Sequence, residues 1–225
     1  MENIKQLFIN AKQTNSFTIH NEFAKTLLSD ESYIDFHYEI LQNTENKTLQ
    51  RIIGKAFVKR GQKGIDFLYD KLLHEQDSSR KANIIHILGL FGQKSVINIV
   101  LKYLNDISEE VRYKVIIVLG WLGDSKTIDV LASQWDKENI GYLRGFLATA
   151  MRQIFFRIAD VRNKVIEFLY NKLKTENDIK AIALMVTTLQ DLEKKKFGLK
   201  ENTQNGDISG DVLNSKIKAL NFKFK

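Results

Sequence analysis

The chain has 225 residues, of which 44% are hydrophobic and 27% are charged, the balance of an ordinary soluble globular protein. It has no cysteine, which excludes disulfide and thiolate chemistry and is typical of a reducing compartment, and it has no apolar run long enough to cross a membrane. The net charge is +7, and residues 193–225 contribute +4 of it through eight lysines and four acidic residues, so the rest of the chain is nearly balanced.

The N-terminal residues are interpreted as a helix rather than a signal peptide. Their apolar residues are spaced as on one helix face, without the continuous apolar core of a secretory leader. The chain also lacks proline, which is costly inside helices and useful in turns and sheet edges. We therefore expect a nearly continuous succession of helices joined by short turns, in a cytoplasmic protein.

A repeat of 31 residues organises the chain. The segments 87–100 and 118–131 share a Leu-Gly-x-apolar-Gly pattern that ends at Gly92 and Gly123, and one further step back reaches Gly61. Glycine at such breaks suits the C-terminal ends of helices, where the backbone often enters the left-handed region. A repeat of this length is typical of stacked helical hairpins.

Six helical hairpins are predicted in chain order, because the segments between the breaks carry apolar residues at helical spacing. In the clearest unit, Val111, Val115, Val118 and Leu122 follow one stripe, and Ser108 precedes it as a helix start. The predicted units are residues 1–30, 31–61, 62–92, 93–123, 124–159 and 160–192.

These units predict one helical domain at residues 1–192 and a basic polar tail at residues 193–225. Within the tail, residues 198–211 have no apolar period and are interpreted as a loop or linker. The last residues, from Val212 onward, are compatible with either a short helix or a strand.

The segment 111–131 resembles the HEAT-like repeat of phycobiliprotein lyases, and the resemblance is clear over residues 61–131. In that family a Val-Arg pair opens the second helix and a Leu-Gly-x-Leu-Gly-Asp segment closes it. The matching residues here are Val111, Arg112, Leu119, Gly120, Leu122, Gly123 and Asp124. The preceding unit departs from the pattern at Arg80, Lys81 and Phe91.

The resemblance implies an all-α fold, a right-handed α-solenoid of about six stacked antiparallel hairpins of the HEAT or armadillo type. It also implies that the second helices line a concave surface. Family members are mostly protein-binding scaffolds and adaptors, with some lyases and repair enzymes among them. The physical argument agrees, since one hairpin cannot bury its apolar face alone and stacking creates an extended surface.

One position of the repeat is a candidate binding row. The residue between the two family glycines recurs as Lys59, Leu90 and Trp121 and, by a shifted register, as Arg157. Trp121 is the sharpest member, because an aromatic side chain with a polar N–H is a favoured binding anchor. The alternative is that Trp121 and Leu90 pack between repeats.

Arginines supply a second set of candidates. Arg144 and Arg152 lie near one helix face with interleaved aromatic residues, and such a face can hold phosphate or an acidic partner. A solvated face is the alternative. Arg112, with Lys81 one repeat earlier, is expected to form a structural ladder with acidic residues of a neighbouring repeat, and Asp106, Glu109 and Glu110 are nearby partners.

The remaining motifs point to no cofactor, metal or catalytic site. The four histidines have no metal-ligand spacing, and no phosphate-binding glycine loop or nucleophile motif is present. We therefore expect a non-catalytic scaffold or adaptor that binds another protein and no membrane. The alternative is a nucleic-acid-binding solenoid resembling DNA alkylation-repair glycosylases, which the pI near 9.3 favours. A chromophore lyase is a third reading, which only the family resemblance suggests.

Overall fold

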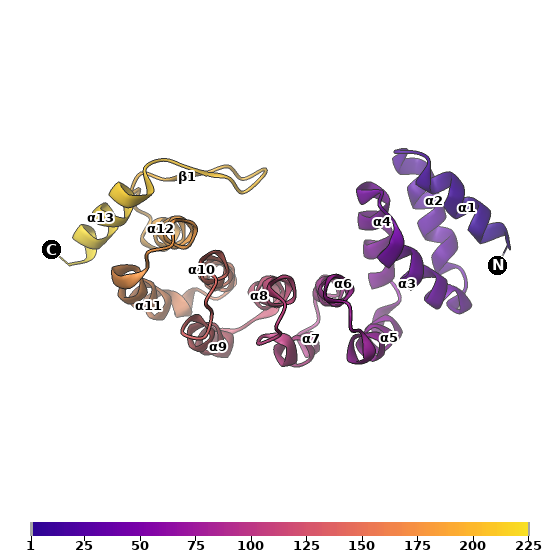
Figure 1. The fold of residues 1–225 in the computed structure, drawn as a ribbon, viewed down its shortest axis with the longest axis horizontal. Helices are drawn as coiled ribbons and strands as arrows, with labels where there is room; N and C mark the ends of the chain where they lie inside the picture. Colours follow the sequence, from indigo (N-terminus) through magenta and orange to yellow (C-terminus); the bar gives the residue numbers. More distant parts are fainter. Residues whose placement is uncertain (1, 225) are drawn as a thin grey trace. The chain divides into compact units, whose positions relative to one another are not determined.

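The computed structural model describes residues 2–224, and within them it contains thirteen α-helices and one very short β-hairpin. This confirms the predicted all-α repeat fold (Figure 1). The chain forms two compact units that divide between Gly92 and Gln93. Both are built from helical hairpins.

The first unit contains three hairpins, and in each the two helices pack against one another. The second helix of each hairpin also packs against the second helix of the next, so α2, α4 and α6 form a continuous layer. The hairpins are α1 (Glu2–Lys12) with α2 (Phe17–Leu28), α3 (Ile34–Asn43) with α4 (Lys47–Val58), and α5 (Gly61–His74) with α6 (Ser78–Leu90).

The second unit continues the same pattern with three more hairpins and an additional C-terminal helix. Its second helices, α8, α10 and α12, make the most extensive contacts in the unit. The hairpins are α7 (Ser95–Val100) with α8 (Glu109–Leu122), α9 (Ser125–Trp135) with α10 (Gly141–Arg157), and α11 (Arg162–Thr175) with α12 (Ile179–Glu193). All six predicted hairpins are therefore present.

Local signals in the sequence set the helix boundaries. Asp77, Asp124 and Asp178 each accept hydrogen bonds from backbone amides in the first turn of α6, α9 and α12. These caps satisfy amides that have no partner within the helix. Gly61 and Gly92 have φ values of 59° and 70°, the left-handed conformation that glycine adopts without strain. The repeat of glycines in the sequence thus marks turns.

The second helices of the second unit approach each other closely where glycine replaces a side chain. A Cβ atom on Gly120 of α8 would lie 3.0 Å from the Ala150 Cα of α10. One on Gly145 of α10 would lie 3.1 Å from the Ala181 Cα of α12. Both distances are shorter than an ordinary van der Waals contact, so the two glycines permit the tight packing of this layer.

The predicted basic tail is a docked cap that belongs to the second compact unit. Helix α13 (Val212–Lys223) packs against α11 and α12, with Ala219 fully buried. Before it, Phe197 and Leu199 are buried, and the Gln190 side chain accepts a hydrogen bond from the Phe197 amide at 2.7 Å. The division predicted at residues 192 and 193 therefore does not mark a boundary between compact units.

The segment predicted as a loop or linker contains a two-stranded antiparallel ladder. Strand β1 (Lys200–Glu201) pairs with β2 (Ile208–Ser209) in this segment. Of the two alternatives for the last residues, the helix is correct. The sequence predicted a separate tail because the apolar residues of this segment are few and follow no repeat. In the structure these apolar residues pack against α11 and α12.

Candidate binding groove between helices α2 and α4

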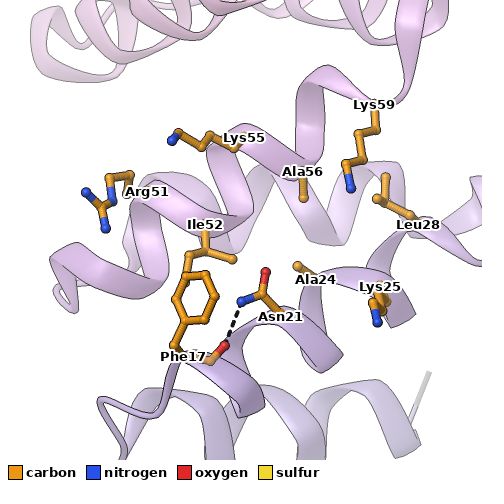
Figure 2. A pocket seen from close by; sticks show the side chains of 10 residues that line it. All are labelled: Phe17, Asn21, Ala24, Lys25, Leu28, Arg51, Ile52, Lys55, Ala56 and Lys59. Carbon is orange, nitrogen blue, oxygen red and sulfur yellow. Dashed lines mark hydrogen bonds between the residues drawn. The ribbon is translucent and has the colours of Figure 1, made fainter.

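A groove of about 290 Å³ lies on the layer of second helices in the first unit, between α2 and α4. Figure 2 shows side chains from both helices around it. The residues that line it are Phe17, Asn21, Ala24, Lys25 and Leu28 from α2, and Arg51, Ile52, Lys55, Ala56 and Lys59 from α4 and its C-terminal end.

The helical period explains why these residues share one surface. Phe17, Asn21, Ala24 and Leu28 lie four, three and four residues apart, which places them on one face of α2. The two helices are held in place at their start by Asn46, whose side chain caps α4 through the Leu49 amide at 3.0 Å. It also donates to the Thr14 carbonyl before α2, at 3.1 Å.

The floor of the groove is apolar and built from small and branched side chains. Ala24, Ile52 and Ala56 form a buried cluster, and Leu28 packs against it. Phe17 lies at one end of the groove and is 65% exposed, whereas the floor residues are buried. An exposed aromatic next to a recessed aliphatic floor is typical of a protein-binding surface.

The rim of the groove is positively charged. Lys25, Arg51, Lys55 and Lys59 are all exposed, and no carboxylate is among the lining residues. Within residues 2–224, these four side chains make no hydrogen bond, ion pair or ring contact. The groove therefore presents four cations whose charge the described chain does not neutralise.

Arg51 differs in this respect from the other arginines. The remaining seven donate side-chain hydrogen bonds to groups elsewhere in the described chain: Arg60, Arg80, Arg112, Arg144, Arg152, Arg157 and Arg162. Arginine suits paired recognition of carboxylates or phosphates. Within residues 2–224, the Arg51 guanidinium makes no such bond and is available for an external partner.

A second hollow of about 350 Å³ adjoins the groove and shares Leu28 and Lys59 with it. Here two of the three cations already have partners. Lys63 lies 2.7 Å from the Glu31 carboxylate, and Arg60 donates to the Leu27 carbonyl at 2.7 Å. The groove between α2 and α4 is thus the part of this surface with unbalanced charge.

The predicted row occupies one position of the second helices. Lys59, Leu90 and Trp121 each lie twelve residues after the first residue of α4, α6 and α8. Lys59 is exposed and lines the groove, while Leu90 and Trp121 are half-buried. The exposure of these side chains does not establish that they bind a partner, and their role in binding stays a prediction.

Arg157 does not belong to this row. Twelve residues after the start of α10 lies Gln153, whereas Arg157 is the last residue of the helix. Its guanidinium donates to the carbonyl oxygens of Gly120 and Gly123, each at 2.8 Å, at the C-terminal end of α8. The register failed because α10 extends to 17 residues, three more than α8.

Arg144 and Arg152 are engaged inside the protein. Arg144 pairs with the buried Glu176 at 2.6 Å. Arg152 pairs with Glu201 of strand β1 at 2.7 Å and with Asp191 at 3.0 Å. Burial would lower the pKa of the Arg152 guanidinium, but its hydrogen bonds to the carboxylates outweigh burial and raise it. These contacts favour a structural role for both residues.

The expected arginine ladder is present, with a different acidic partner. Arg112 donates two hydrogen bonds to Glu138, at 2.7 and 2.9 Å, and Glu138 lies just before the next second helix. Of the three acidic residues expected nearby, Asp106 contacts the Arg112 side chain through its backbone carbonyl, which accepts a hydrogen bond at 2.9 Å. Arg144 repeats this arrangement with Glu176 before α12.

Sequence reasoning missed Lys25, Arg51 and Lys55. The signal available was the spacing of Arg51, Lys55 and Lys59, which lie four residues apart on α4. Such spacing also describes an ordinary solvated helix face, so it identifies a groove only after α2 is placed beside α4.

Residues 65–152 match the family model for HEAT repeats. The matched part is less than half of the chain. It extends from α5 into α10 and includes the segment 111–131 whose motif suggested the family. The groove between α2 and α4 lies before the matched residues, in hairpins that continue the same pattern.

No curated protein matches the sequence. Among solved structures, the chain is similar to the complex of CpcE and CpcF of phycocyanin lyase from Nostoc sp. PCC7120. The similarity has a TM-score of 0.43 at 17% sequence identity and covers 80% of this chain and 73% of that chain. It is too distant to support an argument about function.

Residues 2–224 have dispersed acidic residues and histidines, and helices that are amphipathic or short. These residues contain no group of three or more His, Cys, Asp or Glu side chains placed to hold a metal ion. In the same part of the chain, every helix is too short or too polar to serve as a membrane span.

Proposed function

We propose that this chain is a non-catalytic scaffold or adaptor that binds another protein through the second helices of its hairpins. The observation that carries this proposal is the α2–α4 groove, which combines a recessed apolar floor with four unpaired cations. The HEAT repeats at residues 65–152 support it, because stacked repeats present extended binding surfaces. The absence of cysteine supports a cytoplasmic location for this role.

Within this proposal, the site residues predicted from the sequence have different roles. Lys59 and Leu90 share one position on α4 and α6, and we assign them to the contact surface of the first unit; Trp121, at the same position of α8, is assigned to a contact surface of the second unit. Arg144 and Arg157 stabilise the repeat stack through Glu176 and the end of α8. Such occupied side chains have fewer donors left for a partner.

Nucleic-acid binding is the second candidate function, and the four unpaired cations of the groove favour it. The floor favours a protein instead. Bases stack best on aromatic side chains, and the floor consists of Ala24, Ile52, Ala56 and Leu28, with Phe17 only at one end.

Site-specific photo-cross-linking in the native host tests the proposal. A photoreactive amino acid replaces Lys55, Leu90 or Trp121 on the second helices, and Asp70 on α5 serves as the exposed control position. The proposal expects one polypeptide to be cross-linked from Lys55 and from at least one of the other two positions, but not from Asp70. Cross-links to nucleic acid, or to a protein only from Asp70, would contradict it.

A further inference from the structure

We propose that the α2–α4 groove binds an acidic amphipathic helix of the partner protein. Apolar side chains of that helix contact the groove floor, and its carboxylates pair with the cations of the rim. This inference rests on the proposed function and specifies the chemistry of the partner.

The charge of the groove selects an acidic partner. Four cations line it, no carboxylate does, and none of the four has a partner within the described residues. The nearby Glu31 is taken up by Lys63 at 2.7 Å and leaves the rim charge intact. Bringing carboxylates to this rim is favourable, and it discriminates against neutral or basic partners.

The floor selects an amphipathic partner. Ala24, Ile52 and Ala56 are recessed, and the two alanines leave room above the backbone for a side chain from outside. A peptide with charge alone would leave the 65% exposed Phe17 at the end of this floor without an apolar partner. A helix with leucine-type residues on one face buries it, which is the helix-in-groove mode of recognition.

The length of the groove fits two to three helical turns. Its lining extends over Phe17–Leu28 on α2, which corresponds to about 17 Å at the rise of an α-helix. On α4 the lining extends from Arg51 to Lys59, about 12 Å by the same measure. The cations of α4 are four residues apart, so they face successive turns of a bound helix.

Other anionic surfaces fit less well. A lipid bilayer is contacted by protruding apolar side chains, whereas Ala24, Ile52 and Ala56 are buried. Single-stranded nucleic acid requires stacking platforms along its path, and the groove has only Phe17 at its end.

In the hollow of the second unit lined by Arg162 and Glu193, the two charges already pair at 2.9 Å.

The test uses the full chain and a fluorescent synthetic helix of about 15 residues, long enough for four turns. Its glutamates flank a leucine stripe at i, i+3, i+4 and i+7 spacing. Two control peptides carry glutamine in place of glutamate, or the same residues in an order that breaks the stripe. An oligothymidylate and vesicles of anionic phospholipid are measured in parallel.

The protein variants separate the groove from net charge. The double variant Arg51→Glu, Lys55→Glu reverses two rim charges. The double variant Lys126→Glu, Lys180→Glu makes the same change at exposed, unpaired lysines of α9 and α12. Phe17→Ala removes apolar area at the end of the groove. All these positions are exposed, so circular dichroism is expected to show unchanged helix content.

We expect the acidic amphipathic peptide to bind and the groove double variant to weaken it at least about tenfold. The Lys126→Glu, Lys180→Glu variant should change the affinity less than about twofold, because neither lysine lines the groove and exposed charges outside a site are screened by salt. The control peptides should bind several-fold more weakly than the acidic amphipathic peptide. The substitution Phe17→Ala should weaken the binding of the acidic amphipathic peptide and leave the binding of the control peptides unchanged.

Several results would overturn the inference. The first is that the unaltered chain does not bind the acidic amphipathic peptide, and the second is that both double variants lose affinity for it equally. The third is that the peptide without a leucine stripe binds as tightly as the one with it. The fourth is that the oligonucleotide or the vesicles bind more tightly than the peptide and lose affinity in the groove double variant. The proposed function is tested separately, by the cross-linking experiment. If the groove cross-links a protein in the host but the acidic helix does not bind, only the chemistry assigned to the partner is wrong.

Discussion

Arg144 and Glu176 form a bidentate salt bridge, with Arg144 Nε 2.6 Å from Glu176 Oε2 and Arg144 Nη2 2.7 Å from Glu176 Oε1. The bridge joins α10 to the turn before α12. Burial would raise the pKa of Glu176, but the hydrogen bonds from Arg144 and from the backbone outweigh burial and lower it. The carboxylate is therefore charged in the folded protein and depends on its partner.

Arg144→Ala should lower the free energy of unfolding by about 2–4 kcal/mol, because it leaves a buried carboxylate without its counter-charge. Urea denaturation at neutral pH measures this. Lys63→Ala is the matched control, since its pair with Glu31 is exposed at both ends and such pairs contribute little. Equal effects of the two substitutions would show that the ladder is dispensable.

His37 should make the stability of the first unit depend on pH. Burial lowers the pKa of His37 to about 4, the Ile53 carbonyl opposes this, and Arg60 adds to the lowering. The folded state therefore holds the neutral ring, with Arg60 donating to Nδ1 and Nε2 donating to Ile53. Unfolded histidine binds a proton near pH 6.5, so stability should be full above that pH and fall as the pH drops toward 4.

The expected loss across this window is about 3 kcal/mol, from a shift of somewhat more than two pKa units. An NMR titration of the His37 ring, with denaturation measured at several pH values, checks both parts. A midpoint between pH 6 and 7 for this ring would refute the account.

Glycine-to-alanine substitutions should have opposite effects at two helix interiors. At Gly145 the new methyl would lie 2.6 Å from Leu184 Cδ1 and 3.1 Å from the Ala181 Cα, so we expect a loss of about 1–3 kcal/mol. At Gly54 it would lie 3.6 Å from Leu41 Cδ1, an ordinary contact, so the better helix propensity should add about 0.5–1 kcal/mol. Thermal denaturation of both variants decides. Stabilisation at both positions would mean that α10 and α12 are not closely packed.

Removal of residues 198–225 should destabilise the second unit rather than leave it unchanged. Leu199 and Ala219 are buried, and Arg152 would lose Glu201. Loss of two buried side chains and one ion pair should lower the free energy of unfolding by several kcal/mol, at about 25 cal/mol per Å² of apolar surface exposed. Denaturation of the shortened chain measures this, with Ile217→Ser on the exposed face of α13 as the control. An unchanged transition would mean that the cap is not docked.

The sequence predicted the six hairpins because each carries its own boundary signals. Lys59, Leu90 and Trp121 could be aligned since α4, α6 and α8 begin at a constant interval of 31 residues. Arg157 could not, because α10 starts 32 residues after α8 and is longer, which moves its end away from the common register. A period read from glycines does not detect such a change in helix length.

Contacts between distant segments were not visible in the same way. Glu138 follows Arg112 by 26 residues and lies in a short polar turn, where nothing in its neighbourhood distinguishes it from Glu109 or Glu110. Arg51 resembles any exposed helix cation until its neighbours are known. Its lack of an internal partner is a property of the whole fold, so only the structure separates it from Arg144.

The central claim, that a partner protein binds at the α2–α4 groove, is tested most directly by co-purification with charge-reversed chains. The partner cross-linked from Lys55 is quantified on the tagged unaltered chain, on Arg51→Glu, Lys55→Glu, and on Lys126→Glu, Lys180→Glu. The account predicts that the groove variant loses most of the partner while the other two retain it equally. Equal recovery on all three chains would contradict the account.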